Sequence, residues 1–389
     1  MPEGQISSNN TGKAGASALR YWRWLIAANL VFMAVYLVDH VRHDPYPITY
    51  IHYLVDYHFG FTKRALIGEI VSLVMDRVPP FMVFVESGTI LVLAFALYLQ
   101  LFRKTFGGFT ANAPLFFFIV CSPFVFKHFI KAMGFFDIYG FLLAIVLLLI
   151  PARSLWFVVV AGIGSIILLL IHHLQMLLFI PAIMAIVIVR YYLVRPLRPQ
   201  DIGVGLLYVV AIGVAFIAIQ FFGEVRASPE AFRAYLATRV GGSYNTEKAL
   251  TFFFIWFRTF TDEVKSTWSI MSYNLSWCWV YVVLFTLQIP LIRYIRDTVR
   301  AIESNHQRRV VSLLLVAISA GYLVIFATVF DYGRWMSGWA MCMVLMLHVA
   351  RTLPGAERAR PIPVSEKWVF TAAVILSCFP KVGILEPLY

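Results

Sequence analysis

Long runs of apolar residues that contain no charged side chain recur along the chain and limit the folds it can adopt. Residues 203–222, for example, read GVGLLYVVAIGVAFIAIQFF. A run of this kind matches the hydrocarbon core of a bilayer, where only a helix or a closed barrel satisfies its own backbone. Hydrophobic residues make up 61% of the 389 positions and charged residues only 13%, which is too apolar for a water-soluble domain. The sequence therefore predicts an all-α, polytopic transmembrane bundle.

We expect about ten or eleven transmembrane helices, each about 20 residues long. The predicted spans are residues 22–39, 82–102, 113–126, 137–151, 155–171, 174–190, 203–222, 277–292, 310–330, 335–349 and 368–384. Residues 250–260 are apolar and aromatic, but they are too few to cross. The first residues are polar and rich in Ser, Asn and Gly. We therefore divide the chain into a flexible cytoplasmic tail, 1–21, and a single transmembrane domain, 22–389.

The basic residues lie mainly in one set of connecting loops. With the N-terminus inside, these loops hold 18 of the 32 Lys and Arg residues and six of the 20 acidic residues, and the other side holds 14 of each. An excess of Lys and Arg in short loops marks the cytoplasmic side. The net charge of +12 therefore reflects membrane orientation, and nucleic acid is not an expected partner. We predict a multi-pass protein of a bacterial inner membrane with a cytoplasmic N-terminus.

Two long loops, about residues 40–81 and 223–276, fall on the extracytoplasmic side of this topology. In the first, residues 65–76 (ALIGEIVSLVMD) place polar and apolar side chains on opposite faces of a helix that is too short to span. Such a helix is expected to lie in the membrane interface. In the second loop, Ser228-Pro229-Glu230 is typical of a helix start, which predicts another interfacial helix over 229–239.

Ionisable residues gather near the outer ends of the predicted spans. Charged groups at membrane depth are costly and usually functional. The candidate substrate-binding residues are Lys63, Arg64, Lys127, His128, Lys131, His172, His173, Gln175, Asp331 and Arg334. Arg and Lys bind phosphate and stabilise charge on a leaving group, whereas a poorly solvated carboxylate or an imidazole accepts a proton from a hydroxyl. These residues predict one cavity that binds the phosphate of an amphiphile whose tail stays in the bilayer.

Structural roles are also open for several of these residues. Asp331 can cap the following helix and pair with Arg334 one turn on. Lys127 and Lys131 can extend to lipid headgroups, and the His172-His173 pair can form a solvated turn. The tract DYHFGFTKRALIGE, residues 56–69, is harder to explain structurally, because it places an acid, a His, a Gly-Phe turn and two cations directly before the predicted interfacial helix.

The topology and the first long loop resemble the GT-C superfamily of polytopic glycosyltransferases and the related polymerases of O-antigen and exopolysaccharide assembly. Residues 60–68, GFTKRALIG, are also similar to the G-F-x-x-R-G-L-x-G stretch of uncharacterised bacterial membrane proteins found with polysaccharide genes, with Ala65 in place of the second Gly. In the superfamily a catalytic Asp lies in this loop close to the membrane. The resemblance therefore implies that Asp56, Asp44 or Asp39 is the catalytic base.

The favoured function is a glycosyltransferase or glycan polymerase that acts at the extracytoplasmic face in cell-surface polysaccharide assembly. Its expected partners are a polyprenyl-(di)phosphate-linked glycan, the bilayer and other polysaccharide-assembly proteins. A transporter or flippase for a lipid-linked or anionic substrate is one alternative, although that class binds at the bilayer midplane. A membrane O-acyltransferase with His172 or His173 as base is another. The motifs require no cofactor, and a divalent cation is compatible with the site.

Overall fold

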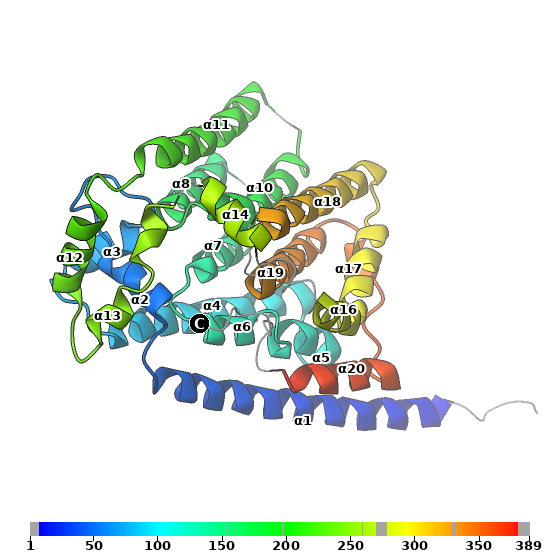
Figure 1. The fold of residues 1–389 in the computed structure, drawn as a ribbon. Helices are drawn as coiled ribbons and strands as arrows, with labels where there is room; N and C mark the ends of the chain where they lie inside the picture. The colour runs from blue at the N-terminus through cyan, green and yellow to red at the C-terminus, as the bar shows by residue number, and fades with distance from the viewer. Residues whose placement is uncertain are drawn as a thin grey trace, which may run out of the picture.

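The computed structural model describes residues 8–379, except 153, 197, 259, 270–277 and 329–331, and every element in this part of the chain is helical (Figure 1). The α-helices are α1 (Ser8–Val41), α2 (Pro47–Leu54), α3 (Leu66–Ser72), α4 (Phe81–Phe106), α5 (Ala113–Phe116), α6 (Phe126–Lys131), α7 (Asp137–Leu149), α8 (Leu155–Ile171), α9 (Gln175–Leu178), α10 (Ile180–Val187), α11 (Pro199–Phe222), α12 (Pro229–Arg239), α13 (Thr246–Ala249), α14 (Phe260–Ser269), α16 (Cys278–Leu287), α17 (Ile289–Ala301), α18 (Asn305–Thr328), α19 (Tyr332–Ala350) and α20 (Lys367–Ser377). Short π-helical or 3-10 turns cover Phe117–Cys121, Ile188–Tyr192, Phe253–Trp256 and Ala356–Arg358. The predicted all-α bundle is confirmed.

Several helices have the length and composition needed to cross a bilayer. Among the described residues there are five: Ser17–Val41, Phe81–Phe106, Ala113–Lys131, Pro199–Phe222 and Asn305–Phe326. Shorter apolar helices cover Asp137–Leu149, Leu155–Ile171, Ile180–Tyr192 and Lys367–Ser377. These helices support a multi-pass membrane protein. The expected total of ten or eleven crossings stays a prediction.

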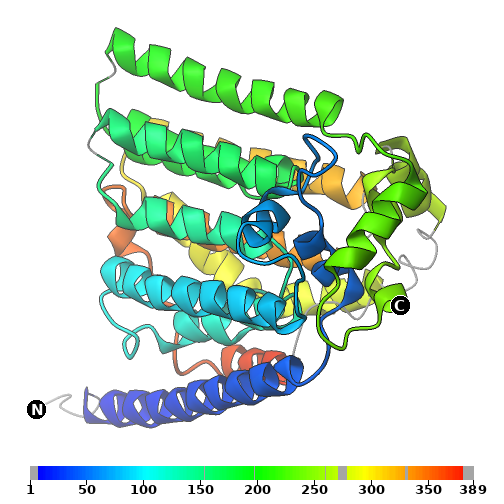
Figure 2. The same cartoon turned by 90° about the vertical axis from the view of Figure 1, so that its left-hand side faces the viewer.

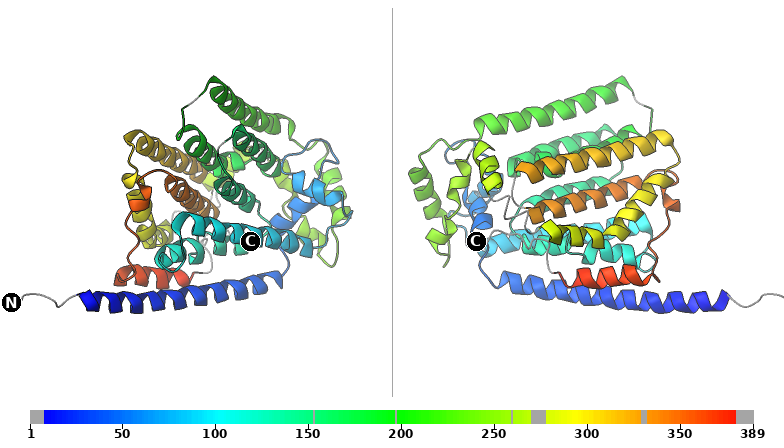
Figure 3. Two further views of the ribbon diagram at one scale, coloured as in Figure 1. Left: turned by 180° about the vertical axis from the view of Figure 1, so that it is seen from behind. Right: turned by 45° about the vertical axis from the view of Figure 1, so that its right-hand side comes forward.

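The long helices run roughly side by side, with α1 along one side of the bundle and α11 along the opposite side (Figure 2). Between them α4 packs against α7, α8 packs against α11, and α18 packs against α19. The elements α2, α3, α12 and α13 gather at one end, which we call the long-loop end, and the described start of α1 lies at the other (Figures 2 and 3). The two long loops therefore meet at the same end of the bundle.

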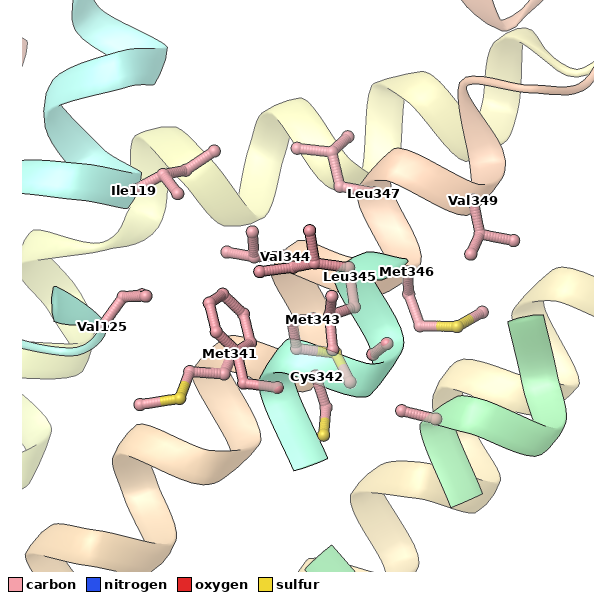
Figure 4. Packing of buried hydrophobic residues seen from close by; sticks show 14 of the residues in the cluster. Ile119, Val125, Met341, Cys342, Met343, Val344, Leu345, Met346, Leu347 and Val349 are labelled. Carbon is pink, nitrogen blue, oxygen red and sulfur yellow. The ribbon is translucent and has the colours of Figure 1, made fainter. Parts of the chain in front are cut away.

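The core is densest around α19. Every residue from Met341 to Ala350 is at least nine-tenths buried, and Figure 4 shows this stretch packed among Ile119, Val125 and other apolar side chains. A helix that is apolar on all sides is stable only when protein surrounds it completely. The apolar sequence of α19 therefore explains its position inside the bundle. Helix α11, in contrast, exposes many apolar side chains, as expected of a helix that faces lipid.

Two predicted segments differ from the structure. The helix α1 begins at Ser8, inside the expected flexible tail 1–21, although the Ser, Asn and Gly residues of its first turns are weak helix formers. The expected span 277–292 also does not continue as one helix: α16 ends at Leu287, and α17 continues to Ala301. Pro290 explains the break, since it lacks a backbone N–H and clashes with the preceding turn.

Both predicted interfacial helices are present. Helix α12 has the predicted bounds, and the Ser228 hydroxyl accepts a hydrogen bond from the Ala231 N–H at 3.2 Å, as an N-cap should. Helix α3 is shorter than residues 65–76. It turns Ile67, Gly68 and Val71 toward the protein and leaves Ile70 exposed, and Leu73 and Val74 directly after the helix are also exposed. Apolar side chains left uncovered at the end of a membrane bundle favour contact with lipid.

The two long loops form a second, smaller core with each other. Its buried members include Tyr50 and Leu54 of α2, Val71 of α3, and Phe232 and Leu236 of α12. Backbone hydrogen bonds join the loops, from the Val78 N–H to the Arg239 carbonyl at 2.8 Å and from the Gly241 N–H to the Val78 carbonyl at 3.1 Å. The loops are thus one packed cap over the end of the bundle.

Candidate functional site

The segment GFTKR, residues 60–64, makes a sharp turn in the first long loop. Gly60 has a φ of 92°, which glycine adopts without strain. Arg64 has a φ of 64° and is the only non-glycine residue with a positive φ in the described part of the chain. An L-residue in this region costs about 1–2 kcal/mol, and such strain is concentrated at functional sites. The strained backbone turns the Arg64 side chain inward, where the residue is only 7% exposed.

The second long loop holds this turn in place. The Lys63 N–H donates to the Gly223 carbonyl at 2.9 Å, and the Trp256 indole N–H donates to the Lys63 carbonyl at 3.0 Å. The Lys63 ammonium donates to the Arg258 carbonyl at 3.3 Å. Hydrogen bonds between Lys63 and three residues of the second long loop therefore stabilise the conformation that carries Arg64.

Arg64 lies against a group of three buried histidines. Its Nε is 3.5 Å from Nδ1 of His173. The His173 ring stacks on the His172 ring with centroids 5.5 Å apart, and the His172 ring is 6.1 Å from that of His52. His52 comes from α2, whereas His172 and His173 form the turn between α8 and α9. A helix of the first long loop and a turn between two bundle helices thus bring these imidazoles together.

A buried ion pair completes the site. The Arg334 guanidinium makes two hydrogen bonds to the Asp137 carboxylate, through Nε to Oδ2 and through a terminal nitrogen to Oδ1 at 2.8 Å. It also lies over the Phe135 ring, with 4.5 Å to the centroid. Its positive charge lowers the pKa of the His52 and His172 imidazoles. We call these six residues the histidine–arginine cluster: His52, Arg64, Asp137, His172, His173 and Arg334.

The cluster holds neutral imidazoles beside positive charge. Burial lowers the pKa of His52, His172 and His173 well below the ordinary value, and the charge of Arg64 lowers each pKa further. Nδ1 of His52 is buried and has no hydrogen-bond partner among the described residues. With the histidines neutral, Arg64 and Arg334 outweigh the single carboxylate of Asp137. The site is therefore suited to an anion, and a bound anion would raise the pKa of the imidazoles toward the range in which they accept a proton.

Gln175 supports the cluster. It is fully buried, and its side-chain amide donates to the Phe136 carbonyl at 2.9 Å. That contact joins the turn carrying the two histidines to the residue directly before Asp137. Gly140 allows the close approach, because a Cβ there would lie 2.6 Å from the Gln175 oxygen and from the Phe179 side chain. These contacts favour a positioning role for Gln175.

The three candidate aspartates lie apart from these contacts. Asp56 is buried and forms an ion pair with Arg239 of α12, and it also accepts hydrogen bonds from the Tyr235 hydroxyl at 2.6 Å and the His58 N–H at 3.0 Å. Asp44 is exposed and lies 3.6 Å from Lys248. Asp39 is exposed near the end of α1. None of these described carboxylate contacts reaches the histidine–arginine cluster.

The basic residues predicted between the third and fourth spans have other surroundings. The Lys127 ammonium is buried and donates to the Asn29 side chain at 2.8 Å, the Ser377 carbonyl at 3.2 Å and the Phe379 carbonyl at 3.3 Å. Lys131 donates to the Tyr46 hydroxyl and lies over its ring. His128 is buried beside Phe129. These contacts favour structural roles, with Lys127 joining α6 to α1 and to the residues that end α20.

One predicted residue, Asp331, lies outside the described residues. Two members of the cluster, His52 and Asp137, belong to the ionisable groups near the outer ends of the predicted spans, but the sequence does not single them out as catalytic or substrate-binding residues. His52 lies on a short helix among several aromatic residues, where sequence favours an interface role, and Asp137 precedes a span, where an acid commonly stabilises a helix start. Their only signal in the sequence is an ionisable side chain next to a long apolar segment.

The described residues contain no group of three or more His, Cys, Asp or Glu side chains placed to hold a metal ion. Comparisons of the chain with protein-family models, with curated proteins and with solved structures found no match.

Proposed function

We propose that the protein transfers a sugar from a polyprenyl-(di)phosphate-linked donor to an acceptor hydroxyl at the extracytoplasmic face of the membrane. The observation that carries the proposal is the histidine–arginine cluster itself, a buried site with an excess of positive charge and neutral imidazoles. Arginine is well suited to bind phosphate through two hydrogen bonds at once. Neutral imidazoles beside it supply a proton acceptor for the attacking hydroxyl.

The surface next to the cluster fits a lipid-linked donor. Helix α3 begins two residues after Arg64, and Leu73 and Val74, which directly follow this helix, are 79% and 77% exposed. Phe221 and Phe222 at the end of α11 are also exposed and directly precede Gly223, which binds Lys63. An apolar strip within a few residues of the phosphate-binding turn allows a polyprenyl tail to stay in lipid while its head group reaches Arg64.

The reaction uses the cluster as follows. The acceptor oxygen attacks the anomeric carbon, a new C–O bond forms, and the bond from that carbon to the phosphate oxygen breaks with its electron pair remaining on the polyprenyl (di)phosphate. Arg64 and Arg334 stabilise the negative charge on the leaving phosphate. His52 accepts the hydroxyl proton. Binding of the anionic phosphate raises the pKa of the nearby imidazoles, since a negative charge favours their protonated form.

The contacts of Asp56, Asp44 and Asp39 favour His52 over these aspartates as the base. Asp56 is the strongest alternative, because it is buried and lies in the same loop. Its ion pair with Arg239 and its hydrogen bonds from Tyr235 and His58 occupy both carboxylate oxygens, so neither oxygen is directed to an acceptor hydroxyl. Variants at Asp56 and His52 separate the two assignments.

The test is transfer of lipid-linked sugar in membranes, with glycan length measured in cells that depend on the variant. Arg64→Gln is expected to lower transfer by roughly 100-fold or more, as loss of a charge-stabilising group does, and His52→Gln should lower it similarly. Arg233→Gln is the matched control, because Arg233 is exposed and pairs with Glu247 on the same cap. Wild-type transfer by both cluster variants would disprove the proposal. Loss of acyl transfer instead of sugar transfer in His173→Gln would favour the O-acyltransferase alternative.

A further inference from the structure

A groove lies between α17, α18 and α19, and it extends from Trp339, five residues after Arg334, to Arg308 near the start of α18. It has a volume of about 390 Å³, within the range of roughly 300–1,000 Å³ for small-molecule sites. Helix α17 contributes residues spaced three and four apart, so one face of this helix forms a continuous wall. Figure 1 shows α17 beside α16 and near the start of α18, at the end where the described start of α1 lies.

The groove is apolar inside and basic at one end. Leu315 and Val316 of α18 and Trp339 and Met343 of α19 line its interior. Arg296 and Arg300 of α17 and Arg308 of α18 line the end where these two helices meet. The described residues that line it include no acidic side chain, and Arg296 pairs at 2.9 Å with Asp297, which does not line the groove. The Arg308 guanidinium donates to the Arg300 carbonyl at 3.2 Å, which keeps the basic residues of the two helices together.

The dimensions suit one acyl chain. From Arg308 to Val316 the wall formed by α18 descends about 12 Å at 1.5 Å per residue, close to the roughly 15 Å of hydrocarbon in one leaflet. Gln288, at the break between α16 and α17, also lines the groove. It is only 6% exposed, and its side-chain nitrogen has no hydrogen-bond partner within the part of the chain that the structure describes. A buried donor without a partner is costly unless a ligand or water satisfies it.

We infer that this groove binds an anionic phospholipid, with its phosphate at Arg296, Arg300 and Arg308 and an acyl chain along α18 and α19. The Gln288 amide donates to an oxygen of the lipid. Basic pockets between membrane helices recognise anionic head groups by charge, and the apolar walls exclude a free phosphate ion as the occupant. The inference does not depend on the proposed transfer reaction, because no residue that lines the groove belongs to the histidine–arginine cluster.

The test measures lipid binding by the full-length protein in phosphatidylcholine nanodiscs. Dioleoyl phosphatidylglycerol is titrated in, and retained lipids are counted by native mass spectrometry. The wild-type protein should retain phosphatidylglycerol in preference to phosphatidylcholine. The double variant Arg296→Gln/Arg300→Gln should bind it roughly tenfold or more weakly. Arg293→Gln is the matched control, since it removes the same charge from α17 at a residue that lies over the Trp368 ring, and it should bind as the wild type does.

Gln288→Leu tests the buried donor and should also weaken retention, whereas a purely apolar groove would bind more tightly. Unchanged unfolding midpoints in phosphatidylcholine alone would show that each variant is folded. Equal retention of phosphatidylglycerol by the double variant and the wild type would overturn the inference. So would equal retention of the two lipids by the wild type. A dimer that the double variant no longer forms would assign the groove to a second copy of the chain and would overturn it as well.

Discussion

The ion pair between Asp56 and Arg239 gives a prediction that separates a structural role for Asp56 from a catalytic one. Their side chains are 6% and 4% exposed, respectively. Asp56 also accepts hydrogen bonds from Tyr235 and His58, and Arg239 lies 3.5 Å from the Gly68 carbonyl. This network attaches α12 to the first long loop, so Asp56 should determine how firmly the two loops of the cap are joined.

The magnitude follows from which charge is left behind. Asp56→Leu removes the carboxylate and leaves the Arg239 guanidinium buried without its counterion, which costs about 3–5 kcal/mol. Arg239→Met leaves a carboxylate that keeps its two hydrogen bonds, so the loss should be smaller. Replacing both residues with apolar side chains removes both desolvation penalties, and the stability should return to within about 1 kcal/mol of the wild type.

Hydrogen exchange of the backbone amides of 229–239 measures this effect in detergent or nanodiscs. A loss of about 3 kcal/mol corresponds to roughly 100-fold faster exchange of these amides. The amides of α7, in the bundle core, are the internal control and should exchange at the wild-type rate. Unchanged exchange of 229–239 in Asp56→Leu would refute the reasoning. Equally fast exchange of these amides in Asp56→Leu and in the double variant Asp56→Leu/Arg239→Met would refute it too.

The same variants report on catalysis. If Asp56 is structural, the double variant Asp56→Leu/Arg239→Met should regain both amide protection and sugar transfer. If Asp56 is the base, the double variant should regain protection and remain inactive. If the double variant regains amide protection but not sugar transfer, Asp56 and not His52 is the catalytic base.

Three further predictions concern stability and pH. Gly68→Ala places a Cβ 1.8 Å from a carbonyl oxygen of the preceding loop and should lower the unfolding free energy by about 3 kcal/mol, whereas Gly213→Ala, with open space around it, should be neutral or raise it by about 0.5–1 kcal/mol. Burial holds the pKa of His52 below its unfolded value of about 6.5, so the unfolded chain binds the proton more readily and the stability of the folded protein falls as the pH drops below about 6.5. In thermal unfolding from pH 7.5 to 5.5, His52→Phe should remove up to about 1.4 kcal/mol per pH unit of this dependence. The control His306→Gln, at an exposed histidine, should leave the dependence unchanged. Lys127→Met should lower stability by about 1–3 kcal/mol without changing the transfer rate per folded molecule, and a selective loss of transfer would restore Lys127 to the site.

Local sequence was enough to predict most helices and one helix cap. The bounds of α12 follow from Ser228 and Pro229, and α8 matches residues 155–171, because capping and uninterrupted apolar length act over a few residues. The structure breaks the predicted span 277–292 near Pro290, although proline in a helix is a local signal. Helix α17 also extends beyond that span to Ala301, through arginines that the sequence pattern places in a loop.

The site depended on contacts between distant parts of the chain. Arg64 and His173 are 109 residues apart, Arg334 and Asp137 are 197 apart, and Arg239 and Asp56 are 183 apart. The sequence identified Arg64, His173 and Arg334 as candidates because ionisable groups beside apolar segments are costly. It could not assign their partners, since nothing within either segment specifies which distant side chain the packing will bring near.

By itself the sequence determined an all-α membrane bundle and the presence of ionisable residues near the ends of its helices, because the cost of exposing a backbone to hydrocarbon acts on each segment separately. Only the tertiary structure decided which of these residues meet. It grouped His52, His172 and His173 with two arginines, placed Asp56 against Arg239, and bound Lys127 to two other helices. Burial and charge compensation depend on the final packing of all segments, and that packing distinguishes a candidate site from a structural ion pair.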